Sequence, residues 1–133
     1  TAHEMGFFTI VYVFNPEESA MMARAGADVI IAHMGLTVGG SIGLDRDGGV
    51  AMRLEDAPAA VQAIGDAATA VNRDVLLVSH GGPIATPEDA AYVQARTSAV
   101  GFIGASSMER LPVEVAITDT VRAFKAAPLR RGG

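Results

Sequence analysis

Two histidines stand where apolar runs end, at positions from which a side chain could do acid–base chemistry. His33 closes the run "DVIIAH", and His80 closes the run "DVLLVSH". An imidazole titrates near neutral pH, so each ring could shuttle a proton, donate a neutral hydrogen bond or bind a metal. A lone histidine at such a place is about as often structural, but two at equivalent places favour function. We therefore predict His33 and His80 as the catalytic residues.

Small residues follow two of the apolar runs and could hold an anionic group. The glycines of "HGGP" let the backbone approach a ligand or take a positive φ, and Thr86 opens a helix whose first amides suit an anion. In "GASS", amides and hydroxyls lie close to an arginine that can bind phosphate or carboxylate. A tight strand-to-helix turn without a ligand is the alternative for "HGGP". The predicted anion-binding residues are Gly81, Gly82, Gly104, Ser106, Ser107 and Arg110.

The segment from Gly35 to Gly49 contains six glycines and is too long for a simple connector. A mobile lid over the site is one interpretation, and a disordered surface insertion is the other. We favour the lid. Its predicted contact residues are Gly35, Thr37, Gly39, Gly40 and Ser41.

The composition narrows the classes of partner and site. Half of the 133 residues are hydrophobic, 19% are charged, and the net charge is −5. No basic cluster precedes the last few residues, so we expect no nucleic-acid partner. No apolar stretch approaches the ~20 residues of a membrane helix, and no signal peptide is visible, so we expect no membrane partner and a cytoplasmic location. The absence of cysteine excludes disulfides and thiolate metal sites, and no carboxylate ends a strand, so no metal ligand is predicted.

The elements that would position these residues alternate regularly. Near-continuous apolar runs over 9–14, 28–34, 74–80 and 99–107 predict strands that are buried on both faces, as in parallel sheets. Helices are predicted to begin at Asn15, near Asp56, at Thr86 and at Leu111, with Pro16 and Pro87 at the first helical position of two of them. Met21 and Met22 are expected to pack in the core. The chain is thus one α/β domain over 1–133, with a frayed tail at 128–133.

Two architectures can be built from four strand–helix units. One is an open flavodoxin-like sheet, and the other is half of a (β/α)8 barrel, which needs about 250 residues when complete. In both, ligands bind at the carboxyl ends of the strands, where the histidines and small residues collect. Half a barrel would leave its inner strand face uncovered, and we expect a missing half or a second copy to cover it. The first residues read as the end of a helix stopping at Gly6, which predicts missing upstream sequence.

Three segments carry a resemblance to a known family: "YVFNPEESAMMARAGADVIIAHMGLTVGGSIG", "HGGPIATPEDAAYV" and "GFIGASSMERLPVEVAI". They resemble the C-terminal half of the phosphoenolpyruvate hydrolase-like TIM-barrel family, which is also similar to a domain of plant tobamovirus-resistance proteins. The resemblance implies that the four units are strands five to eight of a TIM barrel. "HGGP" and "GASS" would then follow strands seven and eight, where barrels frequently hold phosphate.

Two functions are compatible with this resemblance. The first is an enzyme, a hydrolase or lyase acting on a small phosphorylated or carboxylated metabolite of the phosphoenolpyruvate or phosphonopyruvate type. A Mg²⁺ cofactor would fit such a reaction, although its acidic ligands are not visible in this chain. The second is a non-catalytic module that binds a ligand or a protein. We favour the enzyme for the full-length parent, as a homo-oligomer or joined to its N-terminal half, and expect this fragment alone to be inactive.

Overall fold

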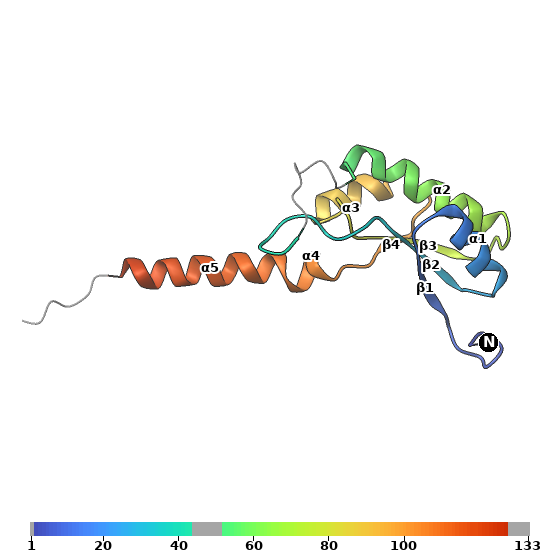
Figure 1. The fold of residues 1–133 in the computed structure, drawn as a ribbon, viewed down its shortest axis with the longest axis horizontal. Coiled ribbons are helices and arrows are strands. Elements are labelled where there is room, and N and C mark those ends of the chain that lie inside the picture. The colour runs from blue at the N-terminus through green and yellow to red at the C-terminus, as the bar shows by residue number, and fades with distance from the viewer. Residues whose placement is uncertain (1, 44–51, 128–133) are drawn as a thin grey trace, which may run out of the picture.

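Strands and helices alternate along the chain in the computed structural model, which describes residues 2–43 and 52–127 (Figure 1). The elements are β1 (Ile10–Val13), α1 (Pro16–Arg24), β2 (Val29–His33), a 3₁₀ turn (Leu54–Asp56), α2 (Ala57–Thr69), β3 (Leu76–His80), α3 (Pro87–Gln94), β4 (Gly101–Phe102), α4 (Ser106–Glu109) and α5 (Leu111–Ala126). The predicted frayed tail at 128–133 and positions 44–49 of the predicted lid lie outside the described residues. No helix in the described ranges combines the length and the apolarity needed to cross a bilayer.

The strands form one parallel sheet in the order β1-β2-β3-β4, so each strand lies beside its predecessor in the chain. Helices α1, α2 and α3 lie on one side of this sheet (Figure 1). A doubly wound open sheet needs a reversal of strand order and helices on both faces. The flavodoxin-like alternative is therefore wrong, and the predicted α/β fold with four units of a (β/α)8 barrel is confirmed.

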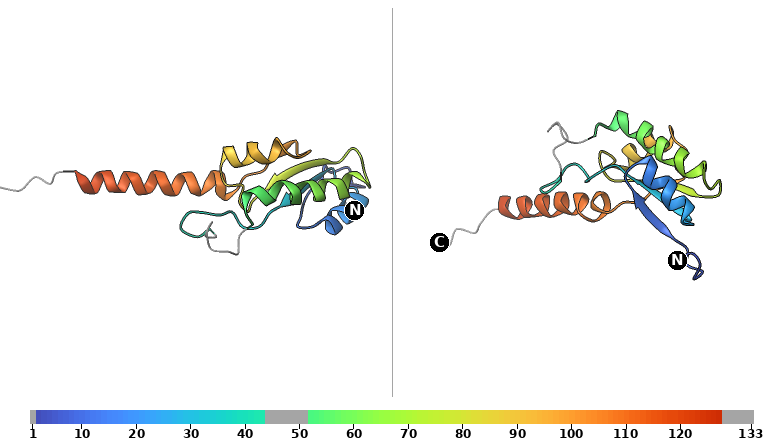
Figure 2. Two further views of the ribbon diagram at one scale, coloured as in Figure 1. Left: turned by 90° about the horizontal axis from the view of Figure 1, so that it is seen from above. Right: turned by 45° about the vertical axis from the view of Figure 1, so that its right-hand side comes forward.

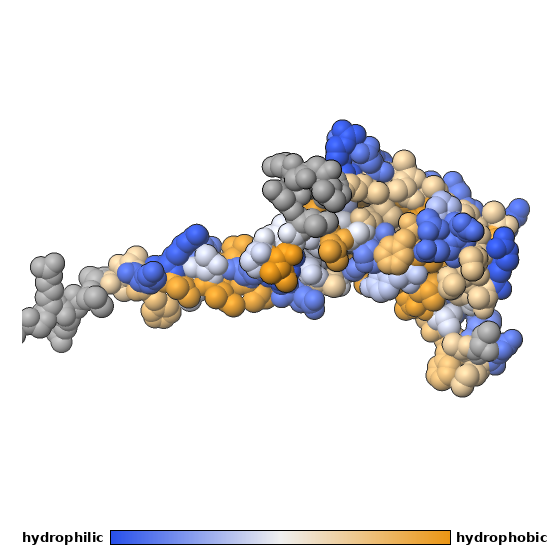
Figure 3. Space-filling view, viewed as in Figure 1, coloured by the Kyte–Doolittle hydropathy of each residue, from blue (hydrophilic) through white to orange (hydrophobic). Residues whose placement is uncertain are grey.

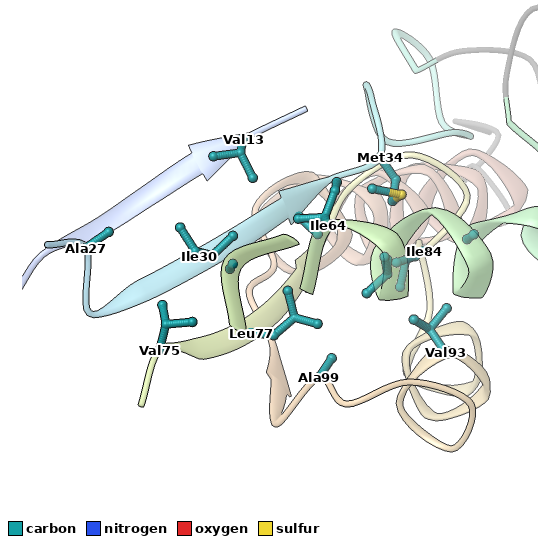
Figure 4. Close-up of a cluster of buried hydrophobic side chains, with 14 of the residues drawn as sticks. Val13, Ala27, Ile30, Met34, Ile64, Val75, Leu77, Ile84, Val93 and Ala99 are labelled. Carbon is teal, nitrogen blue, oxygen red and sulfur yellow. The ribbon is translucent and has the colours of Figure 1, made fainter. Parts of the chain in front are cut away.

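The core lies between the sheet and the helices that cover it, and Figure 4 shows part of it. Ile30 and Leu77 point from neighbouring strands toward Ile64 of α2, and all three side chains are buried. The Ser19 hydroxyl in α1 donates to the Ile64 carbonyl at 2.7 Å, which fastens α1 to α2 inside the core. This layer fixes the strand positions that carry the histidines.

The opposite face of the sheet is covered only in part: Val29 and Ile31 of β2 are buried there, but the edge strand β1 is not. Strand side chains alternate between faces, and the residues that alternate with the core positions of β1 remain half or more exposed: Ile10 at 53%, Tyr12 at 50% and, just beyond the strand, Phe14 at 61%. An exposed apolar strand face is what half of a barrel presents before its other strands close over it.

The helix ends predicted from the capping residue and the glycine stop of α1 agree with the structure. Asn15 accepts a hydrogen bond from the Glu18 amide at 2.8 Å, and the chain after α1 turns at Gly26 with φ +90°. Of the two methionines predicted in the core, Met22 packs against it, but Met21 is 52% exposed, so that prediction was wrong for Met21. Adjacent helical residues differ by about 100° in direction, and only one of the pair can face the sheet.

Replacing Thr86 by alanine should destabilise the domain by about 0.5–2 kcal/mol, the usual cost of losing an N-cap. Thr86 and Asp89 form a capping box, with the Asp89 amide donating to the Thr86 hydroxyl at 3.2 Å. Urea denaturation of the variant against the wild type measures the loss. A serine at the same position keeps the acceptor and should recover most of the stability, and an equally unstable serine variant would contradict the capping argument.

The C-terminal part departs furthest from the predictions. The strand predicted over 99–107 is reduced to Gly101–Phe102, because β4 is an edge strand that pairs only with β3 and the chain becomes helical at Ser106. The last helix was predicted correctly, but α5 extends away from the sheet and has no buried residue (Figure 2). Apolar residues lie along it in Figure 3, and those of the predicted stripe are exposed: Val113, Ile117, Val121 and Phe124.

Candidate functional site

His33 and His80 lie side by side at the carboxyl edge of the sheet. They are register partners in β2 and β3, and their ring centroids are 4.7 Å apart at an interplanar angle of 63°. Parallel strands of equal register end at the same level, which is why two histidines 47 positions apart (80 − 33) come together. The structure thus brings the two predicted catalytic residues into contact, and their catalytic role stays a prediction.

The two rings have opposite hydrogen-bonding arrangements. The Gly35 amide donates to His33 Nδ1 at 3.0 Å, so the neutral His33 ring carries its proton on Nε2. His80 Nδ1 lies 2.6 Å from the Ile103 carbonyl oxygen, which can only accept, so the neutral His80 ring carries its proton on Nδ1. These tautomers are assigned from the hydrogen-bond partners. His33 therefore offers a donor at Nε2 and His80 offers an acceptor.

Two aromatic rings that the sequence interpretation missed border the histidines. The Tyr12 ring centroid lies 5.3 Å from that of His33 and 5.0 Å from that of His80, and the Phe14 centroid lies 4.8 Å from that of His33. Both come from the alternating positions of β1 and its end that face away from the helices. That alternation was readable in the sequence and could have placed Tyr12 and Phe14 at the site.

Burial lowers the pKa of His33 below its ordinary value of 6.5, and the neighbouring His80 lowers it further when charged. A histidine whose folded pKa is depressed is protonated more readily in the unfolded chain. The contribution of His33 to the free energy of unfolding is therefore complete above pH 6.5, the ordinary pKa. It is lost as the pH falls from there through the lower pKa of the folded protein.

Lowering the pH below 6.5 should accordingly reduce the free energy of unfolding, and His33→Gln should reduce the steepness of that fall. Urea midpoints measured from pH 7.5 to 5, ~0.5 unit apart, give the slope for both proteins. The matched control is His3→Gln, because His3 lies at the opposite end of β1, near Asp28. An unchanged slope in His33→Gln would contradict the lowered pKa.

The glycines of "HGGP" join the loops that follow β2 and β3. Gly81 and Gly82 have φ +69° and +58°, and the Gly82 amide donates to the Gly35 carbonyl at 2.7 Å. The Gly82 carbonyl in turn accepts from the Val38 amide at 3.1 Å. The positive φ predicted for this turn is confirmed, while the Gly82 amide is already used within the chain.

The amides predicted to be free at the start of α3 are also occupied. The Ala85 and Thr86 amides both donate to the Asp89 carboxylate, at 3.1 and 3.0 Å. Ala85 and Thr86 precede α3, so a carboxylate of the helix itself already accepts hydrogen bonds from the amides that lead into it. The anion site predicted at this helix start stays a prediction. An exogenous anion would have to displace Asp89.

Arg110 connects the predicted lid to the start of α5. Its Nη1 donates to the Gly39 carbonyl at 3.1 Å and to Glu114 Oε1 at 3.3 Å. The Ser41 amide and hydroxyl donate to the same carboxylate at 2.9 and 2.8 Å, and these bonds lower the pKa of Glu114. The structure thus places Gly39 and Ser41 beside Arg110 and Glu114. These bonds connect the segment between Gly35 and Gly43 to the start of α5, and the bonds of Gly82 connect it to the turn after β3. The role of this segment as a lid stays a prediction.

The remaining predicted anion-binding residues lie beyond β4. Gly104, Ser106 and Ser107 are half-buried at the start of α4. Ser107 lines a mostly apolar hollow of about 370 Å³ on the helix-covered side, together with Phe102 and Met108. This hollow does not include the histidines. We place the chemistry at the histidine pair because the lining of the hollow offers no titratable group.

Comparison with known proteins gives the family. A model of the phosphoenolpyruvate hydrolase-like family matches residues 1–127. The chain is 56% identical over 127 residues to the ToMV susceptible protein tm-1(GCR26) of Solanum lycopersicum, and 55% identical over 126 residues to the ToMV resistance protein Tm-1(GCR237) of the same species. These matches cover 95% and 94% of the chain, which spans 16% of the length of each relative.

Among solved structures, the chain is similar to nitroalkane oxidase from Streptomyces ansochromogenes. The TM-score is 0.49 and the identity 26%, covering 80% of this chain and 29% of that chain. The match over residues 1–127, which carry the sheet and the paired histidines, shows that the chain belongs to the phosphoenolpyruvate hydrolase-like family.

Proposed function

We propose that this domain binds a small phosphorylated or carboxylated metabolite at the carboxyl ends of its strands and acts on it by acid–base chemistry through His33 and His80. The observation that carries the proposal is the contact of the two rings, 4.7 Å apart, with opposite hydrogen-bonding arrangements. Parallel α/β barrels bind their substrates at this end. The family name agrees with a small anionic substrate of the phosphoenolpyruvate type.

The loops after β3 and β4 are proposed to receive the anionic group. Gly81 follows His80 and Gly104 follows Ile103, the carbonyl partner of His80, so both glycines lie next to the histidine pair in the chain. The residues of the described part do not fit a Mg²⁺ site, because no group of three histidine, cysteine or carboxylate side chains is placed together there. The Gly35 amide donates to His33 Nδ1, so Nε2, the nitrogen left to bind a metal, carries the proton of the neutral ring. We derive no step through a metal ion.

The test is a titration of the ¹⁵N-labelled intact protein with phosphoenolpyruvate and phosphonopyruvate, observing the imidazole signals. Saturable shifts of His33 and His80, with His3 unmoved, are expected, and inorganic phosphate release would identify the hydrolase. Sodium sulfate at matched ionic strength controls for salt. His80→Gln should weaken the response and abolish release. If neither ligand moves either ring, the proposed site is wrong.

A binding module without turnover is the second candidate. The observation in its favour is the similarity to proteins named for susceptibility and resistance to a virus, which are not named as enzymes. The same titration separates the two candidates. Saturable shifts with no phosphate release and no change in the ligand spectrum over a day would support the module and exclude the hydrolase.

We further propose that the uncovered strand face is closed by four more strand–helix units, from an N-terminal half or from a second copy. Support comes from the exposed Ile10, Tyr12 and Leu76 on that face. The measurement is the native mass beside the denatured intact mass. A complex with a different polypeptide supports the first form, and a homo-oligomer supports the second. A stable monomer of this chain alone would overturn the proposal.

A further inference from the structure

We propose that His80 is the base and His33 the neutral hydrogen-bond donor for a substrate that carries a proton on the carbon next to a carbonyl, of which a short 2-oxo acid is the simplest case. This inference rests on the proposed function, because it assigns chemistry to the same pair of rings. It adds the direction of proton transfer, the part played by each ring and the class of substrate.

The free nitrogen of each ring is accessible. Within residues 2–43 and 52–127, the hydrogen bond made by each ring is the one through Nδ1, to the Gly35 amide for His33 and to the Ile103 carbonyl for His80. No side-chain nitrogen or oxygen in these ranges is both buried and without a partner. Nε2 of each ring is therefore not fully buried, although the His80 side chain as a whole is only 7% exposed. A ligand reaching the pair would meet one donor and one acceptor.

The backbone anchors suit these two roles. When His80 accepts a proton on Nε2, its Nδ1–H already donates to Ile103 at 2.6 Å, and this bond becomes charge-assisted and stronger. His33 cannot share the charge easily, because burial and a charged His80 both lower its pKa. The hydrogen bonds therefore assign the roles: His80 Nε2 is the acceptor that can take a proton, and His33 keeps its Nε2–H as a donor.

A base beside a neutral donor is the combination that enolisation needs. His80 Nε2 takes the proton from carbon, the C–H bond breaks, and its electron pair forms the carbon–carbon double bond. The carbonyl π pair moves onto oxygen, which accepts a hydrogen bond from His33 Nε2–H as negative charge develops. Return of the proton from His80 restores the ring. Every atom and electron is accounted for without an oxidant or a second reactant.

Two aromatic rings form one wall of the site. Tyr12 and Phe14 place aromatic rings within 5.3 Å of the histidine centroids. The Tyr12 and Phe14 rings therefore border one side of the histidine pair. The carboxylate of a 2-oxo acid would then lie toward the loops proposed to hold the anionic group.

The experiment follows hydrogen–deuterium exchange at the methyl group of pyruvate in D₂O by ¹H NMR, with the intact protein as catalyst. Exchange above the buffer rate is expected. His80→Gln should lose about 10²–10⁴-fold of the protein-dependent rate, which is the usual contribution of a general base. His33→Gln, which keeps an amide donor, should lose less, and His3→Gln should be unchanged. Folding of each variant is checked from its amide NMR spectrum.

A second measurement on the wild-type protein is independent of turnover. Long-range ¹H–¹⁵N correlation at pH ~8 should show the Nε2–H tautomer for His33 and the Nδ1–H tautomer for His80. Identical tautomers would overturn the assignment of roles. Pyruvate that shifts both rings without exchanging would overturn the carbon-acid chemistry and leave the proposed site standing. If neither pyruvate nor phosphoenolpyruvate shifts the rings, both proposals fail.

Discussion

Replacing Gly82 by alanine should destabilise the domain by roughly 2–4 kcal/mol. Gly82 has φ +58°, a region that costs an alanine about 1–2 kcal/mol. An added Cβ would also collide with the Met34 carbonyl oxygen, a backbone atom that cannot rotate away. The turn cannot relax easily, because hydrogen bonds to Gly35 and Val38 fix Gly82 on both sides. The loss is measured as the change in unfolding free energy by urea denaturation.

The matched control is Gly101→Ala in β4. An added Cβ there meets no heavy atom within 4 Å, and its φ is not in the left-handed region. The substitution should therefore change the unfolding free energy by no more than about 0.5 kcal/mol. Equal losses in the two variants would show that the turn after β3 does not need its glycine.

The predictions that succeeded rest on local signals. Asn15 and Thr86 each begin a helix because the cap, the following proline and the acid of the first turn are neighbours in sequence. The continuous apolar runs gave the strands of a parallel sheet because both faces of such strands are usually covered. The neighbouring histidines followed from the position of each at the end of its strand, once the two strands are in register.

What the sequence did not reveal depends on partners that are distant in the chain. The tautomers of His33 and His80 are set by the Gly35 amide and the Ile103 carbonyl, and the second of these lies 23 positions away. Arg110 was predicted to bind an anion, but the structure pairs it with Gly39, 71 positions away, and with Glu114. A composition pattern can identify a residue able to bind an anion, but it cannot show that the chain already supplies the partner.

Replacing Ile30 by alanine should destabilise the domain by about 2–5 kcal/mol, the range for removing a fully buried isoleucine side chain. Ile30 is 0% exposed and faces Ile64 from the helix side of β2. Ile10 lies on the neighbouring strand but on the other face, and it is 53% exposed. In a monomer of this chain, Ile10→Ala should therefore cost no more than about 0.5 kcal/mol. Urea denaturation of the two variants gives the comparison.

The same pair of variants tests what covers the inner face. If four further strands close over β1, Ile10 becomes a core residue, and its replacement should cost as much as that of Ile30, within the ~2–5 kcal/mol range. In a homo-oligomer, the cost of Ile10→Ala should also depend on protein concentration, because unfolding then includes dissociation. The cost of Ile30→Ala comes from the core within one chain, so this part of the loss does not depend on protein concentration. A small, concentration-independent cost at Ile10 in the native assembly would mean that this face stays open, and the barrel would have to be abandoned for this protein.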